Sequence, residues 1–320
     1  MVEVKNLVKR YGDKLAVNNV SFTVNEGEIL GFLGPNGAGK STTMNIITGY
    51  LSSTSGTVTI DGCEILDDPK GAKSKIGYLP EMPPLYQDMT VKRYLEFVYD
   101  LKKVTLPKQE HLSEVAKVTK ITDVYDRIIK NLSKGYRQRV GLAQALIGNP
   151  PVIILDEPSV GLDPKQIIEM RNLIRGLGKK HTVILSSHVL SEIQAVCDRI
   201  VVINNGQLVA DESTQEITST VKGIKRLQLH IFGSDAYIMP ALRGVEGVTR
   251  ARKISRTPDG YGEYVVEYND DNDIRKGVFN AMAKINCPIV MMRNAEMSLE
   301  DAFLKITNGE NVTSRRGGRK

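Results

Sequence analysis

The sequence has 320 residues, of which 41% are hydrophobic and 25% charged, and its formal net charge is +6. This length suits two domains, and the composition excludes a fibrous or disordered chain. Four of the positive charges lie in the last six residues, so the rest of the chain, at +2, is nearly balanced and we expect no nucleic acid partner.

The cysteines and the apolar runs exclude two further classes of protein. Cys63, Cys197 and Cys287 are far apart and never form a Cys-x-x-Cys pair, which argues against a disulfide framework or a zinc site. Free thiols fit a reducing cytoplasm. No apolar run approaches the roughly 20 residues of a membrane-spanning helix, and the N-terminus lacks the apolar core of a signal peptide. A role at a membrane would therefore need a separate membrane protein.

Strand and helix patterns alternate over the first two thirds of the chain. Residues 2–12 and 14–24 alternate between apolar and polar side chains, which predicts two strands of a small antiparallel sheet. Further strands are predicted at residues 28–34, 75–80, 151–156, 182–187 and 199–204, with helices between several of them. Residues 85–148 contain only helical patterns. The predicted fold class is α/β, a largely parallel sheet covered by helices, with an antiparallel β subdomain and a helical subdomain.

The pattern changes after about residue 215. The predicted order becomes β-α-β-β-α-β, which suggests a small α+β domain of the ferredoxin-like type at residues 216–308. A helix with Ser298 at its cap would close this domain. Residues 309–320 form a basic tail that we expect to be flexible. The expected domains are thus residues 1–215, residues 216–308 and this tail.

The most specific motif is GPNGAGKST, which fits G-x-x-x-x-G-K-[ST] and lies between a predicted strand and a predicted helix. Glycines let the backbone N–H groups of such a loop face phosphate oxygens, and the helix N-terminus adds a favourable dipole. Lys40 would contact the β- and γ-phosphates, and the Ser41 hydroxyl would bind Mg²⁺. The motif predicts a P-loop NTPase rather than a chance glycine-rich turn, with expected phosphate-binding residues Gly34, Pro35, Asn36, Gly37, Ala38, Gly39, Lys40, Ser41 and Thr42.

A pair of acids follows the apolar run at residues 151–155. A buried strand does not tolerate two carboxylates at its end without compensation. Asp156 could hold Mg²⁺, and Glu157 could act as the general base toward an attacking water. The alternative is a strand that ends at an ordinary acidic turn, and the phosphate loop argues against it.

Together these motifs resemble the ATP-binding subunit of an ABC transporter. That family carries a signature of the form LSGGQ before the acidic strand, and the corresponding stretch here is LSKGY. Ser133 and Gly135 match, whereas Lys134 and Tyr136 depart from the pattern. The resemblance implies that this motif closes over ATP held by a second copy, so that a homodimer holds two nucleotides at its interface. Ser133 could instead be an ordinary helix cap.

Four more positions follow from the resemblance. It implies that Tyr11 stacks on adenine, that His188 contacts the γ-phosphate, and that Asp163 lies in a loop crossing between subunits. Each has a structural alternative: a strand-end tyrosine, a structural histidine, and the cap of a helix starting at residue 164. Glu81 stands where most of the family has glutamine, and it is either an Mg²⁺ ligand or a solvated loop acid.

The resemblance implies an ATPase with ATP and Mg²⁺ bound, in which Glu157, His188 and Lys40 are catalytic. It would drive export through a separate transmembrane permease, contacted by residues 81–110, from the cytoplasmic face of the membrane. The C-terminal domain resembles that of exporter ATPases for drugs, polysaccharides and gliding motility. The alternatives are a soluble ABC ATPase acting on a ribosome or nucleic acid, a small-molecule kinase, and a non-hydrolysing module. A single phosphate loop and the absence of sustained heptads disfavour the first of these.

Overall fold

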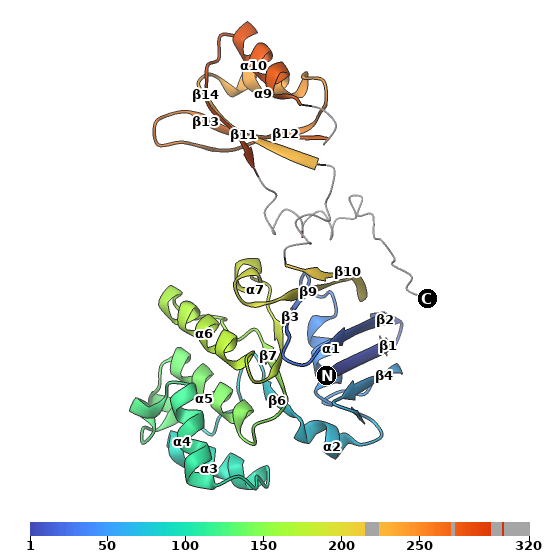
Figure 1. Ribbon diagram of the computed structural model, residues 1–320, viewed down its shortest axis with the longest axis vertical. Coiled ribbons are helices and arrows are strands. Elements are labelled where there is room, and N and C mark those ends of the chain that lie inside the picture. The colour runs from blue at the N-terminus through green and yellow to red at the C-terminus, as the bar shows by residue number, and fades with distance from the viewer. Residues whose placement is uncertain (215–223, 270–272, 296–302, 304–320) are drawn as a thin grey trace. The chain divides into compact units, whose positions relative to one another are not determined.

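The computed structural model describes residues 1–214, 224–269, 273–295 and 303 (Figure 1). The chain divides into two compact units, Met1–Thr214 and Gln215–Lys320. The expected closing helix at Ser298 and the basic tail at 309–320 lie outside the described residues. No helix in the described ranges is long and apolar enough to cross a membrane.

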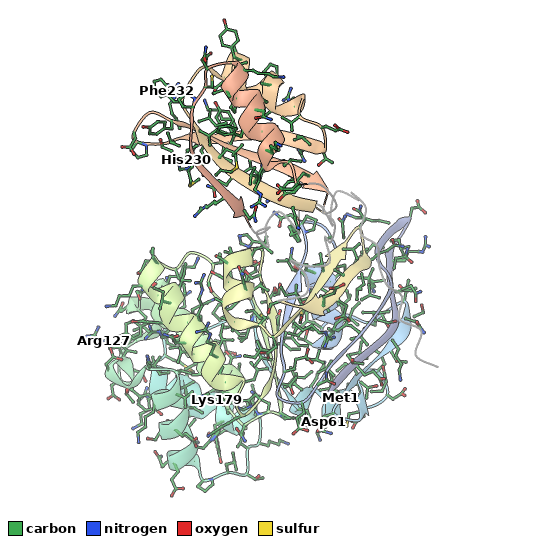
Figure 2. All side chains as sticks on the ribbon, turned by 45° about the horizontal axis from the view of Figure 1, so that its top comes forward. Met1, Asp61, Arg127, Lys179, His230 and Phe232 are labelled. Carbon is green, nitrogen blue, oxygen red and sulfur yellow. The ribbon has the colours of Figure 1, made fainter. Side chains whose placement is uncertain are left out.

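An antiparallel sheet forms one edge of the first unit. Its strand order is β2-β1-β4-β5, with β1 at Val2–Tyr11, β2 at Lys14–Val24, β4 at Ser55–Ile60 and β5 at Cys63–Glu64. The pairing of β1 with β4 places the terminal ammonium of Met1 3.9 Å from Asp61 Oδ1 (Figure 2). The sequence predicts β1 and β2 but not β4 and β5, which are short and carry polar residues.

A second sheet of the first unit has the order β10-β9-β3-β8-β7-β6. The strands are β3 (Ile29–Leu33), β6 (Ile76–Leu79), β7 (Val152–Asp156), β8 (Thr182–Ser186), β9 (Arg199–Asn204) and β10 (Gln207–Ser213). All pairs are parallel except β9 with β10. The apolar residues of the central strands are buried on both faces, as covering helices require. The carboxyl ends of β3, β7 and β8 therefore meet at one edge of the sheet.

Four helices accompany this sheet in sequence. They are α1 (Lys40–Ile47), α2 (Pro69–Ser74), α6 (Pro164–Leu177) and α7 (Leu190–Val196). Helix α1 follows β3 and is buried along most of its length, so Met44 and Ile46 join the core shared by the two sheets. Helix α6 follows the loop after β7 and turns a face with Met170 and Ile174 inward. The loops at the starts of α1 and α6 thus lie at the carboxyl edge of the sheet.

The chain between β6 and β7 is helical (Figure 1). It contains α3 (Val91–Leu101), α4 (Lys108–Val118), the 3₁₀ turns Thr122–Val124 and Ile129–Asn131, and α5 (Lys134–Leu146). Thr90 caps α3 by accepting a hydrogen bond from the N–H of Arg93. Every third or fourth residue of α3 is buried, including Val91, Leu95 and Val98, so its inner face packs on neighbouring helices.

The second unit has its own core. Its elements are β11 (Ile224–Ile231), α9 (Asp235–Arg243), β12 (Val248–Arg256), β13 (Gly262–Asn269), α10 (Arg275–Lys284) and β14 (Ile289–Ala295). The order along the chain is β-α-β-β-α-β, and the antiparallel sheet runs β12-β13-β11-β14. This is the strand order of a ferredoxin-like sheet. Side chains of β11, such as Leu227 and Leu229, pack against Ile238 of α9 and Val278 of α10 in this core.

Candidate functional site

A cleft of about 550 Å³ opens at the carboxyl edge of the parallel sheet. It brings together residues that are up to 177 positions apart in the chain, from β1, the loop before α1, and the ends of β7 and β8. Among the residues predicted from sequence, the cleft is lined by Tyr11, Asn36, Gly37, Gly39, Lys40, Ser41, Thr42, Glu81, Asp156, Glu157 and His188. It is also lined by Lys14, Ala16, Val160 and Ser186, which sequence reasoning missed.

The loop before α1 needs its glycines for two different reasons. Gly39, at φ +108°, adopts a conformation that side chains disfavour, and a Cβ there would lie 2.6 Å from the carbonyl oxygen of Ala16. A Cβ on Gly34 would collide with the carbonyl oxygen of Ile203. Gly34, Pro35 and Ala38 do not line the cleft, and Ala38 is buried. Gly34 and Ala38 are the buried side of the loop, whereas Pro35 is exposed and accepts a hydrogen bond from the N–H of Ala38 at 3.1 Å.

Lys40 is buried although it is charged. Its ammonium donates hydrogen bonds to the carbonyl oxygens of Gly34 at 2.6 Å and Pro35 at 3.2 Å, which hold it under the loop. Burial lowers the pKa of Lys40, and the negative charges of Glu157 and Asp156 oppose this. A desolvated cation at the start of a helix favours an anionic ligand in this cleft.

The two acids at the end of β7 have unusual environments. Burial raises the pKa of Asp156 and also that of Glu157, so both are stronger bases than exposed carboxylates. Glu157 adopts a left-handed conformation with φ +50°, and its N–H donates to the carbonyl oxygen of Ser186 at 3.0 Å. Such a conformation is strained in a residue with a side chain, and Glu157 lines the cleft.

His188 supports Glu157. Its Nδ1 lies 2.8 Å from Oε2 of Glu157. An ionised carboxylate only accepts hydrogen bonds, so Nδ1 carries a hydrogen and is the donor of this hydrogen bond. This hydrogen bond limits the rise in the pKa of Glu157. The imidazole is more than half exposed, which leaves its outer edge free to meet a ligand.

The cleft offers oxygen ligands that suit a hard divalent cation. They are the hydroxyl of Ser41 and the carboxylates of Asp156 and Glu81. Within the described ranges, no cluster of three or more His, Cys, Asp or Glu side chains could hold a metal by itself. Phosphate oxygens would therefore have to complete the coordination of such an ion. Mg²⁺ bound together with a nucleotide is coordinated in this way.

Besides Gly34, Pro35 and Ala38, three further predicted residues do not line the cleft: Ser133, Gly135 and Asp163. Ser133 caps α5 and accepts from the N–H of Tyr136 at 3.4 Å, and Asp163 caps α6 and accepts from the N–H of Gln166 at 2.9 Å. Gly135 faces the side chain of Gln166, where a Cβ would be 2.7 Å away. The first turns of α5 and α6 therefore pack against each other.

The missed residues carried weak signals. Lys14 pairs with Tyr11 across the turn between β1 and β2, so the hairpin register places both at the same end of the strands. Ser186 is the last residue of β8 and pairs with Asp156, which puts it at the same edge of the sheet. Ser186 could be found only by knowing how the parallel strands are ordered.

The chain is similar to known proteins over the whole first unit. Residues 17–160 match the family described as "ABC transporter". Over 218 residues the chain is 40% identical to YxlF of Bacillus subtilis, an uncharacterized ABC transporter ATP-binding protein, and the match covers 68% of this chain and 72% of that protein. The chain belongs to the ABC transporter ATP-binding proteins. The ABC ATPase fold class predicted from the sequence is thereby confirmed, and the second unit is the small α+β domain that this prediction includes.

Further relatives of this ABC ATPase are named for what they transport. The bacitracin transport ATP-binding protein BcrA of Bacillus licheniformis is 35% identical over 213 residues, covering 66% of this chain and 69% of BcrA. The Nod factor export ATP-binding protein I of Burkholderia orbicola is 30% identical over 311 residues, covering 97% of each chain.

A solved structure shows a related cassette after hydrolysis. This dimeric ATP-binding cassette, bound to ADP and phosphate, is 28% identical with a TM-score of 0.60, over 67% of this chain and 99% of that chain. The ABC ATPase described here is an ATP-hydrolysing motor subunit of a transporter, as the sequence predicts.

Proposed function

We propose that this ABC ATPase acts as a homodimer at the cytoplasmic face of the membrane and drives export through a separate permease. One observation carries the proposal: Ser133, Gly135 and Asp163 do not line the cleft of their own chain. If they contact nucleotide, the nucleotide must be held by another copy. The dimeric cassette with ADP and phosphate supports this arrangement, and the export named for the Burkholderia relative supports the direction of transport.

Lys40 and the loop before α1 hold the triphosphate in this proposal. At the loop, the N–H groups of Gly37 and Gly39 and the buried ammonium of Lys40 would favour phosphate. Tyr11 is about half exposed, and the Lys9 ammonium lies over its ring at 5.3 Å from the centroid. Adenine would stack on the ring face that Lys9 leaves open. Lys14, on the facing residue of the hairpin, adds a second cation at this end of the cleft.

Mg²⁺ fits the oxygen donors of the cleft. Ser41 and Asp156 would bind it together with the phosphates, and Glu81 would be an additional ligand. The bound ion would neutralise charge on the phosphate oxygens. The pKa of Asp156 is raised by burial in the structure, and a bound cation would favour its ionised form.

Glu157 is the proposed general base, and His188 positions it. The raised pKa of Glu157 makes its carboxylate a better proton acceptor for an attacking water. The hydrogen bond from His188 Nδ1 fixes the carboxylate, and the exposed edge of His188 would contact the γ-phosphate. Glu157, whose backbone is left-handed, lines the cleft in which the phosphates would lie.

The helical region after β6 is the proposed contact with the permease. A groove of about 490 Å³ lies beside it, lined by aromatic and apolar residues that include Tyr50, Tyr78 and Met82. Tyr50 is 86% exposed and Met82 84% exposed, which is unusual for such side chains unless a partner covers them.

We assign residues 1–215 to the ATP-binding domain, with the helical subdomain at 85–148, and residues 216–308 to the C-terminal domain.

Co-expression with the permease of a neighbouring gene tests the proposal. The ATPase should fractionate with membranes only when that permease is present, and its ATP turnover should then respond to detergent-solubilised or reconstituted permease. A protein that stays in the supernatant with the permease present, and that co-purifies with RNA or DNA instead, would refute the permease assignment.

A further inference from the structure

A second cleft, of about 830 Å³, lies between α2 and the end of α3. Lysines line it on two sides: Lys70 and Lys73 from α2, and Lys102 and Lys103 from the end of α3. Its floor is apolar and includes Ile76 of β6 and Ile147 after α5. None of the residues that line this cleft carries a carboxylate.

The lysines of this cleft have no carboxylate partners in the described part of the chain. Lys70, Lys73 and Lys103 are exposed and make no salt bridge there. The stem of Lys102 is also exposed, but its ammonium lies against protein and donates to the carbonyl oxygens of Gln144 at 3.1 Å and Ile147 at 3.0 Å. These acceptors are neutral, so the positive charge stays uncompensated. Burial accordingly lowers the pKa of Lys102 to about 8.

The shape and charge of this cleft determine what would fill it. Four uncompensated cations around an apolar floor match a ligand with several carboxylates and at least one apolar group. A flat membrane surface would reach the rim of the cleft but not its floor. The chain's own C-terminal tail is basic and would be repelled. An acidic protein segment that inserts an apolar side chain fits both features.

The lysine cleft also adjoins the groove assigned above to the permease. Lys102 and Ile76 line both of them. A polypeptide lying in the aromatic groove of Tyr50 and Met82 would continue directly into the lysine cleft. The two surfaces therefore form one contact area, aromatic at one end and cationic at the other.

We propose that the cleft of Lys70, Lys73, Lys102 and Lys103 binds an acidic segment of the permease, beside the segment that the aromatic groove takes. This inference rests on the proposed function, because the identity of the partner comes from it. The cationic end would orient the permease segment through its acidic residues, and the aromatic groove would anchor it.

A blocked pentapeptide of sequence EELEE is a suitable probe, titrated into the full-length protein at low salt and followed by NMR. The triple variant K70E/K73E/K103E should weaken peptide binding by roughly tenfold or more, because three attractive charges become repulsive. Lys102 is left intact since its ammonium holds the end of α5. The matched control R243E/K276E/K284E changes the charge equally on exposed residues of the second unit and should bind the peptide as the unmodified protein does.

Two further measurements make the outcome decisive. ATP turnover without permease should be the same in the two triple variants and in the unmodified protein, because the lysine cleft is not part of the ATP site. The K70E/K73E/K103E variant should co-purify with the permease at a reduced yield. Equal peptide binding in both variants would overturn the inference. The inference would also be overturned if the K70E/K73E/K103E variant bound the peptide as before but no longer bound vesicles of phosphatidylcholine with phosphatidylglycerol. The ligand of the cleft would then be a lipid.

Failure of the inference and failure of the proposed function are distinguishable. If the unmodified protein does not associate with any permease but the peptide still discriminates between the variants, the partner assignment is wrong and the acid-binding cleft stands. If the protein associates with the permease equally in all variants and ignores the peptide, the proposed function stands and this cleft has no role in it.

Discussion

The Nδ1 of His188 donates a hydrogen bond to Oε2 of Glu157 across the ends of two neighbouring parallel strands. The carboxylate is mostly buried and the imidazole mostly exposed, so one partner faces the protein and the other faces the cleft. Any ligand that displaces His188 would change the position and the basicity of Glu157 together. This contact therefore links ligand binding in the cleft to the ability of Glu157 to accept a proton.

Replacing Glu157 by Gln should abolish hydrolysis and preserve ATP binding. Glutamine has the size of glutamate but cannot accept the proton of the attacking water, so turnover should fall by a factor of about 10² to 10⁴. With both nucleotides intact, the dimer should persist. Phosphate release and size-exclusion chromatography with Mg·ATP measure the two effects. Normal turnover in this variant would show that Glu157 is not the base.

Replacing His188 by Ala should lower turnover with a small effect on nucleotide affinity. The variant loses the hydrogen bond that fixes Glu157, and the pKa of Glu157 should rise further because one of the effects that lower it is gone. The pH at which turnover is half-maximal on its acid side should therefore move upward. A pH profile of the turnover rate checks this, with a nucleotide-binding titration as the control. An unchanged profile would assign His188 a purely structural role.

Asp156 should make the nucleotide-free protein less stable as the pH rises. Its pKa in the folded state lies above the ordinary value of 3.8. At a pH between the ordinary pKa and the raised pKa, the folded protein therefore binds more protons than the unfolded chain. Stability then falls as the pH rises through that window and stays reduced above it. We expect Asp156→Asn to be more stable than the unmodified protein at pH 7.5, by roughly 0.5–2 kcal/mol.

Denaturant unfolding without nucleotide measures this difference at several pH values. The advantage of Asp156→Asn should shrink as the pH is lowered toward the ordinary pKa of aspartate. Asp67→Asn makes the same replacement at an exposed residue and is the matched control. If the stability gain of Asp156→Asn did not depend on pH, the buried charge of Asp156 would not be its cause.

Lys134 and Gly161 form a pair that a double-mutant cycle can test. The end of the Lys134 side chain lies against Gly161, which has φ +70°, so a Cβ at residue 161 would collide with the ammonium. Gly161→Ala should therefore destabilise the protein by about 1–3 kcal/mol, from backbone strain and displacement of Lys134 together. Adding Lys134→Ala should recover the part that is due to the collision. Thermal unfolding of the four proteins gives the coupling. Additive effects would mean that the two residues do not interact.

The sequence alone was sufficient to predict those structural elements that one continuous segment of the chain determines. The glycines and the helix start of the loop at residues 34–42 can be recognised within that segment alone. The apolar runs at β3, β7, β8 and β9 have the length of single strands, and a strand that is apolar throughout is buried on both faces of a sheet. The strands that were missed, β4, β5 and β10, are short or alternate with polar residues, and they are stabilised by pairing with strands from elsewhere in the chain.

The tertiary structure alone decided which residues share the cleft. The strand order β3-β8-β7 brings His188 to Glu157 and Ser186 to Asp156, although the sequence separates each pair by 30 residues or more. It also places Ser133 and Asp163 at helix caps away from the cleft of their own chain. Strand order is set by long-range packing of apolar faces, and a motif confined to one segment carries no information about it.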